Sequence, residues 1–152
     1  MNLNDPFPAS TIHWRVGATN SDKSQGIALA YLDARDVMDR LDECMPGLWQ
    51  CRYPWSDGKR VCCEIGIYNT NEWMWRSDGA GETDYEGDKG AFSDAFKRAA
   101  VRWGIGRYLY DLPNAWVPIE QRGKSYVFSK ETQKQLTERF AQWQEKKYGQ
   151  SV

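Results

Sequence analysis

The chain has 152 residues, a formal net charge of −1, 41% hydrophobic residues and 27% charged residues. This length suits one domain with its own core, and the near-zero charge excludes a protein that is basic throughout. A nucleic-acid contact would need local clusters of the 20 lysines and arginines. No apolar run approaches the ~18 residues of a membrane span, and the first residues lack the pattern of a signal peptide. We expect a soluble cytoplasmic protein with no membrane partner.

The cysteines do not have the spacing of a metal site. Cys44, Cys51, Cys62 and Cys63 contain no C-x-x-C pair, and the one histidine, His13, lies far away in the sequence. A structural zinc site normally needs four such ligands in characteristic pairs. We therefore expect no metal and four reduced, mostly buried thiols, which suits the cytoplasm.

The first part of the chain predicts two short strands and a helix. We expect strands over residues 12–16 and 27–32, separated by a polar loop over 18–25. Asp33 has the side chain of a helix N-cap. The apolar spacing that follows it predicts a helix to about Cys44.

The middle of the chain predicts an antiparallel meander. Apolar and polar residues alternate in three runs, and Ser, Asn, Asp and Gly separate these runs. Alternation also puts Trp73 and Trp75 on one face of the third strand. The expected strands are residues 48–53, 60–68 and 72–77, with turns at 56–59 and 69–71.

The segment from Gly90 to Pro113, GAFSDAFKRAAVRWGIGRYLYDLP, carries the strongest functional signal. At 100° per residue, its apolar side chains fall on one helix face. Lys97, Arg98 and Arg102 occupy the complementary arc, which suits a line of phosphates. Glycines end the helix. The apolar face consists of Phe92, Ala95, Phe96, Ala99, Ala100 and Trp103.

The C-terminal part predicts a basic loop over 121–124, a strand over 126–128 and a final helix capped by Ser129. That helix either packs on its own domain or serves a partner. The whole order predicts an α+β single domain in which a β-β-β-α core packs an antiparallel sheet on the basic helix. We divide the chain into a core of residues 1–120 and an extension of residues 121–152.

Two enzyme classes can be weighed from the residues. No G-x-x-x-x-G-K-[ST] motif occurs, so nucleotide hydrolysis is not expected. A metal-dependent nuclease is kept as an alternative because several carboxylates lie on a strand and the adjacent loop. A nuclease usually has a lysine or histidine near the metal, and none stands beside these carboxylates at short spacing. A Ser/His/Asp or Cys/His hydrolase is not expected either, because nothing orients His13. The carboxylates are Glu64, Asp78, Glu82, Asp84, Glu86 and Asp88.

Four segments resemble a known family: YLDARDVMDRLDE, Trp49, the strand CCEIGI, and above all SDAFKRAAVRWGIGRYLYDLP. Together they resemble the Rad-fifty-two/Rad-twenty-two family of single-strand annealing proteins in its short bacterial or bacteriophage form. Residues 12–117 are the best-matched part. The resemblance implies ring- or filament-forming homo-oligomers that bind single-stranded DNA and anneal complementary strands in recombination and repair. It implies no ATP, no cofactor and no catalytic residue.

The resemblance also implies DNA-binding residues. Lys97 and Arg98 match the basic pair on the DNA-facing helix of the family. Arg102 lies one residue after the family's third basic position, which is occupied here by Val101. The first two residues therefore match the family pattern more closely than the third.

Further contacts are expected outside the helix. A family arginine early in the first helix falls at Asp36, with Arg35 adjacent. Arg52, Lys59 and Arg60 surround the first hairpin and are candidates for the other wall of a DNA groove. End protection, an interaction module without annealing, and binding of a single-strand-binding protein remain open.

Overall fold

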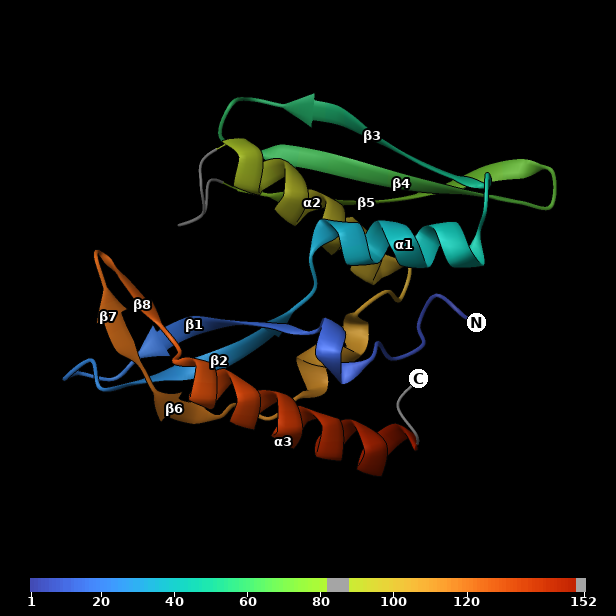
Figure 1. Cartoon of the computed structure of the whole chain (residues 1–152). Helices are drawn as coiled ribbons and strands as arrows, with labels where there is room; N and C mark the ends of the chain where they lie inside the picture. Colours follow the sequence, from blue (N-terminus) through green and yellow to red (C-terminus); the bar gives the residue numbers. More distant parts are fainter. Residues whose placement is uncertain (82–87, 150–152) are drawn as a thin grey trace. The chain divides into compact units, whose positions relative to one another are not determined.

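The computed structural model describes residues 1–81 and 88–149, with no side-chain description at 88 and 89. The chain forms two compact units. The first unit comprises Met1–Asp5 and Asp33–Tyr108, and the second comprises Pro6–Leu32 and the chain from Leu109 onward (Figure 1). Among the described residues, no helix has the length and apolar character to cross a bilayer.

The first unit is built on the predicted antiparallel meander, with strand order β3-β4-β5. The first and third strands extend past their predicted ends. The strand β3 continues through Pro54, which lies within a register irregularity between Arg52 and Trp55, where no ladder donor is required. The strands are β3 (Trp49–Ser56), β4 (Val61–Asn69) and β5 (Glu72–Ala80).

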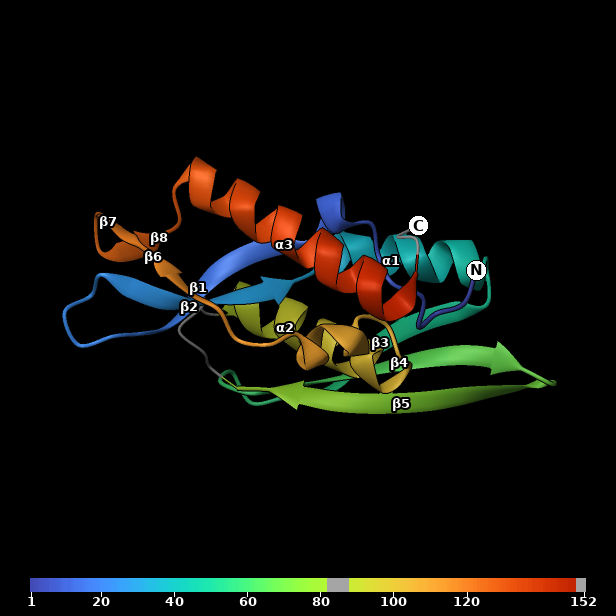
Figure 2. The same ribbon diagram turned by 90° about the horizontal axis from the view of Figure 1, so that it is seen from below.

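Helix α2 (Asp88–Arg102) packs on β4 and β5, against one face of the sheet (Figures 1 and 2). Alternate residues of β4 face this helix and are 0–4% exposed. On the helix, Ala95, Ala99 and Ala100 are fully buried and Phe96 is 1% exposed. The small residues allow α2 to approach the sheet closely, and Phe96 supplies a large part of the buried apolar surface. The buried hydrophobic side chains of β4 are Val61, Cys63, Ile65 and Ile67.

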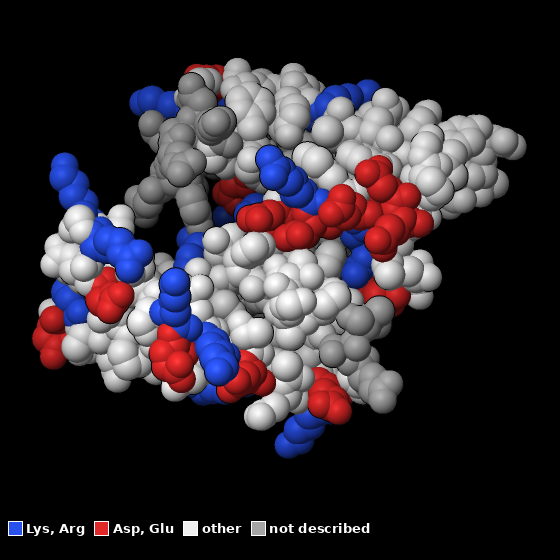
Figure 3. Space-filling model, viewed as in Figure 1, with Lys and Arg blue, Asp and Glu red and all other residues white. Residues whose placement is uncertain are grey.

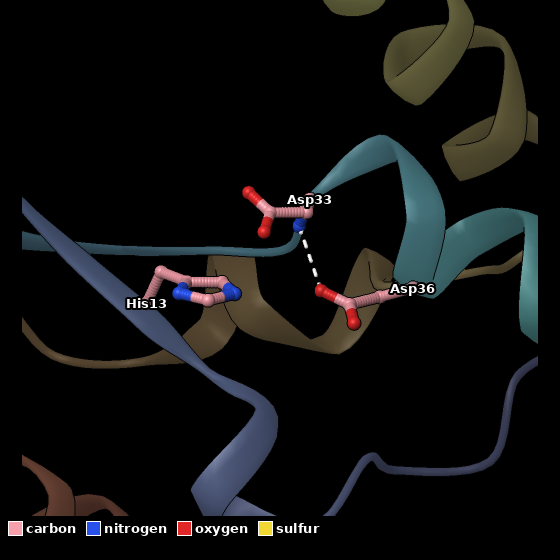
Figure 4. A group of neighbouring side chains, drawn as sticks. All are labelled: His13, Asp33 and Asp36. Atoms are coloured by element: carbon pink, nitrogen blue, oxygen red, sulfur yellow. Dashed lines mark hydrogen bonds between the residues drawn. The ribbon is translucent and has the colours of Figure 1, made fainter.

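Helix α1 (Ala34–Cys44) begins at the predicted N-cap. The Asp33 backbone N–H donates to Oδ2 of Asp36 at 2.9 Å, which satisfies one exposed donor at the helix start (Figure 4). His13, also drawn in Figure 4, is a residue of the second unit. The buried guanidinium of Arg40 donates from Nη1 to the carbonyls of Leu3 and Asp5 at 2.9 and 2.6 Å. This side chain ties the N-terminal residues to α1.

The second unit contains a three-stranded antiparallel sheet of order β1-β2-β6 and a two-stranded hairpin, β7-β8. The predicted loop over 18–25 is shorter than expected, because β1 continues to Thr19 and β2 begins at Gln25. Strands β6 and β7 were not expected from the sequence, because three residues each are too few to show alternation. The elements are η1 (Ala9–Thr11), β1 (His13–Thr19), β2 (Gln25–Tyr31), β6 (Trp116–Pro118), β7 (Glu120–Arg122) and β8 (Ser125–Val127).

Helix α3 (Lys130–Tyr148) begins at the predicted cap, where the Ser129 hydroxyl accepts a hydrogen bond from the Thr132 backbone N–H at 3.1 Å. Leu136 belongs to the buried core of the second unit, and Phe140 makes an edge contact with Trp14 at 6.0 Å between ring centroids. The apolar face of α3 therefore packs on its own unit.

The expectation of mostly buried cysteines is wrong. Cys63 is fully buried, Cys44 and Cys62 are partly buried, and Cys51 is exposed. Cys51 lies on β3, an edge strand of the sheet, which leaves it more open to solvent than Cys63 on the central strand. All four are free thiols.

Candidate nucleic-acid interface

The predicted basic arc lies on the solvent side of α2. Lys97 is partly buried, whereas Arg98 and Arg102 are exposed. We call these three residues the cationic ridge. The opposite face of the helix is held by its packing on the sheet and by the Trp103 indole N–H, which donates to the Ile65 carbonyl at 3.0 Å. The ridge is therefore presented by a firmly anchored helix.

Carboxylates partly neutralise the ridge. Nε of Arg98 lies 3.2 Å from Oδ2 of Asp94, one turn earlier on α2. Nε of Arg102 lies 3.0 Å from Oδ2 of Asp78 on β5. The two arginine side chains remain 49% and 58% exposed. Exposed pairs of this kind contribute only ~0–1 kcal/mol, so a phosphate can compete with the carboxylates.

An arginine-lined depression lies at the C-terminal end of α2. It has a volume of about 440 Å³ and is lined by Arg76, Ser77, Arg102 and Arg107. Arg76 comes from the edge strand β5, and its guanidinium stacks over the Trp103 ring at 4.0 Å. We call Arg76, Arg102 and Arg107 the arginine cluster.

Two glycines bring Arg107 into this cluster. Gly104 and Gly106 have φ angles of 94° and 74°, which strongly favour glycine, so the chain reverses directly after α2. Arg107 then donates from Nε and Nη2 to the Val101 carbonyl at 3.0 and 2.8 Å. Neither Arg76 nor Arg107 was expected from the sequence to bind DNA. The available signal was the pair of glycines, which predicts that the residue after them returns to the helix end.

Arg52 lies on the opposite face of the sheet. It is paired across the strands with Glu64, and its Nε lies 3.1 Å from Oε1 of that residue. Its guanidinium also stacks over the Trp75 ring at 3.7 Å. Asp78, which contacts the ridge, stands opposite Cys63 and thus on the helix-covered face. The sheet therefore separates Arg52 from the cationic ridge.

The remaining predicted residues do not line the depression. Lys59 and Arg60 lie at the β3–β4 turn, where Nη2 of Arg60 is 3.1 Å from Oδ2 of Asp57. Arg35 is exposed in the first turn of α1. Figure 3 shows acidic side chains gathered over α1, so Arg35 lies in acidic surroundings. The acidic residues at and within this helix are Asp33, Asp36, Asp39, Asp42 and Glu43.

The two carboxylates named for a nuclease site do not come together. Glu64 faces Arg52 on one side of the sheet, and Asp78 faces Arg102 on the other. A shared metal needs both oxygens within one coordination shell, so the expectation of a joint site is wrong for this pair. Glu82, Asp84 and Glu86, together with the side chain of Asp88, lie outside the described residues.

The fold and the site define an α+β protein in which a cationic helix is packed on a β-β-β meander. Residues 57–128 match the family described as Rad52/22 family double-strand break repair protein. This match contains β4, β5, α2 and the arginine cluster. It confirms the resemblance to the Rad-fifty-two/Rad-twenty-two family that the helix motif had indicated.

Two curated relatives carry the name single-stranded DNA-binding protein DdrA. The protein from Deinococcus deserti is 44% identical over 119 residues, covering 76% of this chain and 58% of the relative. The protein from Deinococcus radiodurans is 42% identical over 129 residues, covering 82% of this chain and 62% of the relative. The chain thus spans about six-tenths of the length of these relatives. No solved structure matches it significantly.

Proposed function

We propose that this protein binds single-stranded DNA along the cationic ridge and anneals complementary strands in DNA repair and recombination, without ATP. The observation that carries the proposal is the ridge itself, three cationic side chains on a helix whose other face is locked into the sheet. The similarity to proteins named for single-stranded DNA binding supports it.

Phosphate contacts explain how such a surface would act. Lys97, Arg98 and Arg102 would neutralise backbone charges without reading bases, so binding would be independent of sequence. Several protomers side by side would hold the strand extended, with its bases available for pairing. Base pairing itself would then supply the specificity of annealing. A chain with a net charge of −1 can present such a basic surface locally.

A fluorescence annealing assay with complementary oligonucleotides, without ATP or metal, tests this function. We expect faster annealing than in protein-free solution, and no acceleration with a folded Lys97→Ala/Arg98→Ala variant. Binding without acceleration would overturn the annealing activity. If exonuclease resistance of the bound ends accompanied that result, end protection would replace annealing as the function.

The same preparation tests whether the protein is an enzyme. We propose that it is not, and labelled single- and double-stranded DNA should stay intact in Mg²⁺ or Mn²⁺ while single-stranded DNA shows a mobility shift. Metal-dependent cleavage by the purified protein would contradict this proposal.

Homo-oligomer formation is part of the proposal. One protomer covers too few nucleotides to align a strand, so the protein should sediment well above 17.6 kDa, at least with single-stranded DNA present. A strictly monomeric species on and off DNA would contradict this model.

We also propose that the protein acts in the cytoplasm, where a single-strand-binding protein is a further candidate partner.

A further inference from the structure

The arginine cluster places three guanidinium groups around one depression. Arg76 reaches it from β5, Arg102 is the last residue of α2, and Arg107 is the first residue of the 3-10 helix η2 (Arg107–Asp111). All three side chains belong to exposed residues of the first unit. Guanidinium groups are the side chains best suited to bidentate contacts with phosphate oxygens.

Part of this cluster has a structural role. Nη1 of Arg76 donates to the Arg102 carbonyl at 2.7 Å, and Nη2 of Arg107 donates to the same carbonyl at 3.0 Å. Carbonyl groups at a helix C-terminus lack intrahelical donors and carry partial negative charge. These bonds therefore cap α2 and fix the orientation of two guanidinium groups.

Capping does not use all of the donors. A guanidinium has five N–H donors. Over residues 1–81 and 88–149, hydrogen bonds engage only Nη1 of Arg76, Nε of Arg102, and Nε and Nη2 of Arg107. The remaining nitrogen groups are available to an oxyanion in the depression. Among the described residues, the ion pair of this cluster is the one between Arg102 and Asp78, so three positive charges face that carboxylate.

We propose that Arg76, Arg102 and Arg107 form a phosphate-binding site that holds a backbone phosphate of single-stranded DNA at the C-terminal end of the cationic ridge. This inference rests on the proposed function and extends it to two residues, Arg76 and Arg107, outside the ridge. Arg102 belongs to both groups, so a strand following α2 passes from the ridge into the site. Fixed guanidinium groups lose less freedom on binding than mobile ones, which favours this position for a phosphate.

The sharpest test is a gain of binding. In Asp78→Asn, Arg102 loses its carboxylate partner and the depression gains one unit of positive charge. We expect about threefold tighter binding of oligo(dT) at low salt, an effect that unfolding cannot produce. Glu120→Gln is the matched control, because it also removes one negative charge from an arginine ion pair. In that pair, which belongs to the second unit, Oε1 of Glu120 lies 3.7 Å from Nη2 of Arg122. Equal affinity of Asp78→Asn and Glu120→Gln would overturn the site.

A loss of binding tests the two added residues. Arg76→Gln and Arg107→Gln should each weaken oligo(dT) binding roughly fivefold and flatten the log–log salt slope by about 0.7. The unfolding midpoints of both variants should be compared with that of the unaltered protein, to check that each variant is folded. Arg107→Lys should restore the salt slope, because lysine keeps the positive charge. Unchanged slopes in both folded glutamine variants would show that these arginines only cap the helix.

These variants separate the failure of the site from the failure of the proposed function. If the Lys97→Ala/Arg98→Ala variant loses binding while the Arg76 and Arg107 variants do not, the ridge stands and the site is wrong. If no variant affects binding, the proposed function is wrong as well.

Titration with inorganic phosphate, followed by NMR, gives a readout without DNA, since the Arg76 and Arg107 Nε–H resonances should shift. No shift up to high phosphate would contradict the site.

Discussion

Nε of Arg102 lies 3.0 Å from Oδ2 of Asp78, and this ion pair joins the last residue of α2 to the edge strand β5. The two residues are far apart in sequence, and the packing of the helix on the sheet brings them together. Asp78 thus restrains the one arginine shared by the ridge and the depression. It also competes with any phosphate bound there.

Arg102→Ala should separate the stability of the protein from its binding of DNA. The arginine side chain is 58% exposed, so loss of the ion pair should lower the free energy of unfolding by less than ~1 kcal/mol. Single-stranded DNA binding should weaken for all sequences alike, and the salt slope should flatten by about 0.7. Urea unfolding and binding titrations at several salt concentrations measure the two effects. A large loss of stability with an unchanged salt slope would contradict the assignment.

Phe96 and Phe92 form a matched pair on one helix. Phe96 is 1% exposed on the sheet-facing side of α2, whereas Phe92 is 38% exposed and makes an edge contact with Tyr53. Phe96→Ala should lower the free energy of unfolding by roughly 3–5 kcal/mol because it leaves a cavity in the core. Phe92→Ala should cost about 1 kcal/mol, since it leaves no closed cavity. Similar urea midpoints for the two variants would be inconsistent with the packing described.

Trp103 anchors the end of α2 through its indole N–H. Trp103→Phe keeps an aromatic ring but removes the donor to the Ile65 carbonyl at 3.0 Å, so one partly buried hydrogen bond is lost. We expect a loss of ~0.5–1.5 kcal/mol in the free energy of unfolding. The arginine cluster should also loosen, because Arg76 stacks on this ring. Unfolding curves identical to those of the unaltered protein would refute the anchoring role.

Cys63 and Cys51 should differ in chemical reactivity. Burial, with a smaller contribution from the nearby Cys51, raises the pKa of the Cys63 thiol from 9.0 to about 12. Burial also raises the pKa of Cys51, but this residue is exposed. At pH 8 a thiol reagent should therefore modify Cys51 slowly and leave Cys63 unmodified until the protein unfolds. Equal labelling rates in the folded protein would contradict this burial.

The same shift makes a prediction about pH. The folded thiol keeps its proton to a higher pH than the unfolded thiol, so its stabilising contribution is full below about pH 9 and is lost as the pH rises from about 9 towards 12. The free energy of unfolding should fall more steeply over that range in the unaltered protein than in Cys63→Ala. Parallel pH profiles would exclude the effect.

The sequence predicted those parts of the fold that depend on local patterns. Three alternating runs gave the meander, and the apolar face of α2 agreed with the observed burial of Ala95 and Phe96. Alternation also put Trp73 and Trp75 on one face, where their ring centroids are 6.2 Å apart. Strands β6 and β7 escaped prediction because their partners, not their three residues, determine their structure.

The candidate site divides in the same way. Lys97, Arg98 and Arg102 lie on one helix, so helical spacing alone was sufficient to group them. Arg76 comes from a strand, and only tertiary packing brings it to the depression. Arg107 follows the two glycines that return the chain to the end of α2, so its place depends on local backbone conformation. The position of Arg52 on the far face depended on strand register, which composition and turn positions do not give.

The most direct test of the central claim is the salt dependence of oligo(dT) binding by the Lys97→Ala/Arg98→Ala variant. Both side chains lie on the solvent arc of α2, so the variant should fold with nearly unchanged stability. Each lost phosphate contact should flatten the log–log slope by about 0.7, giving about 1.4 for the pair, with much weaker binding at low salt. A folded variant with unchanged affinity and an unchanged slope would contradict the claim that this ridge binds single-stranded DNA.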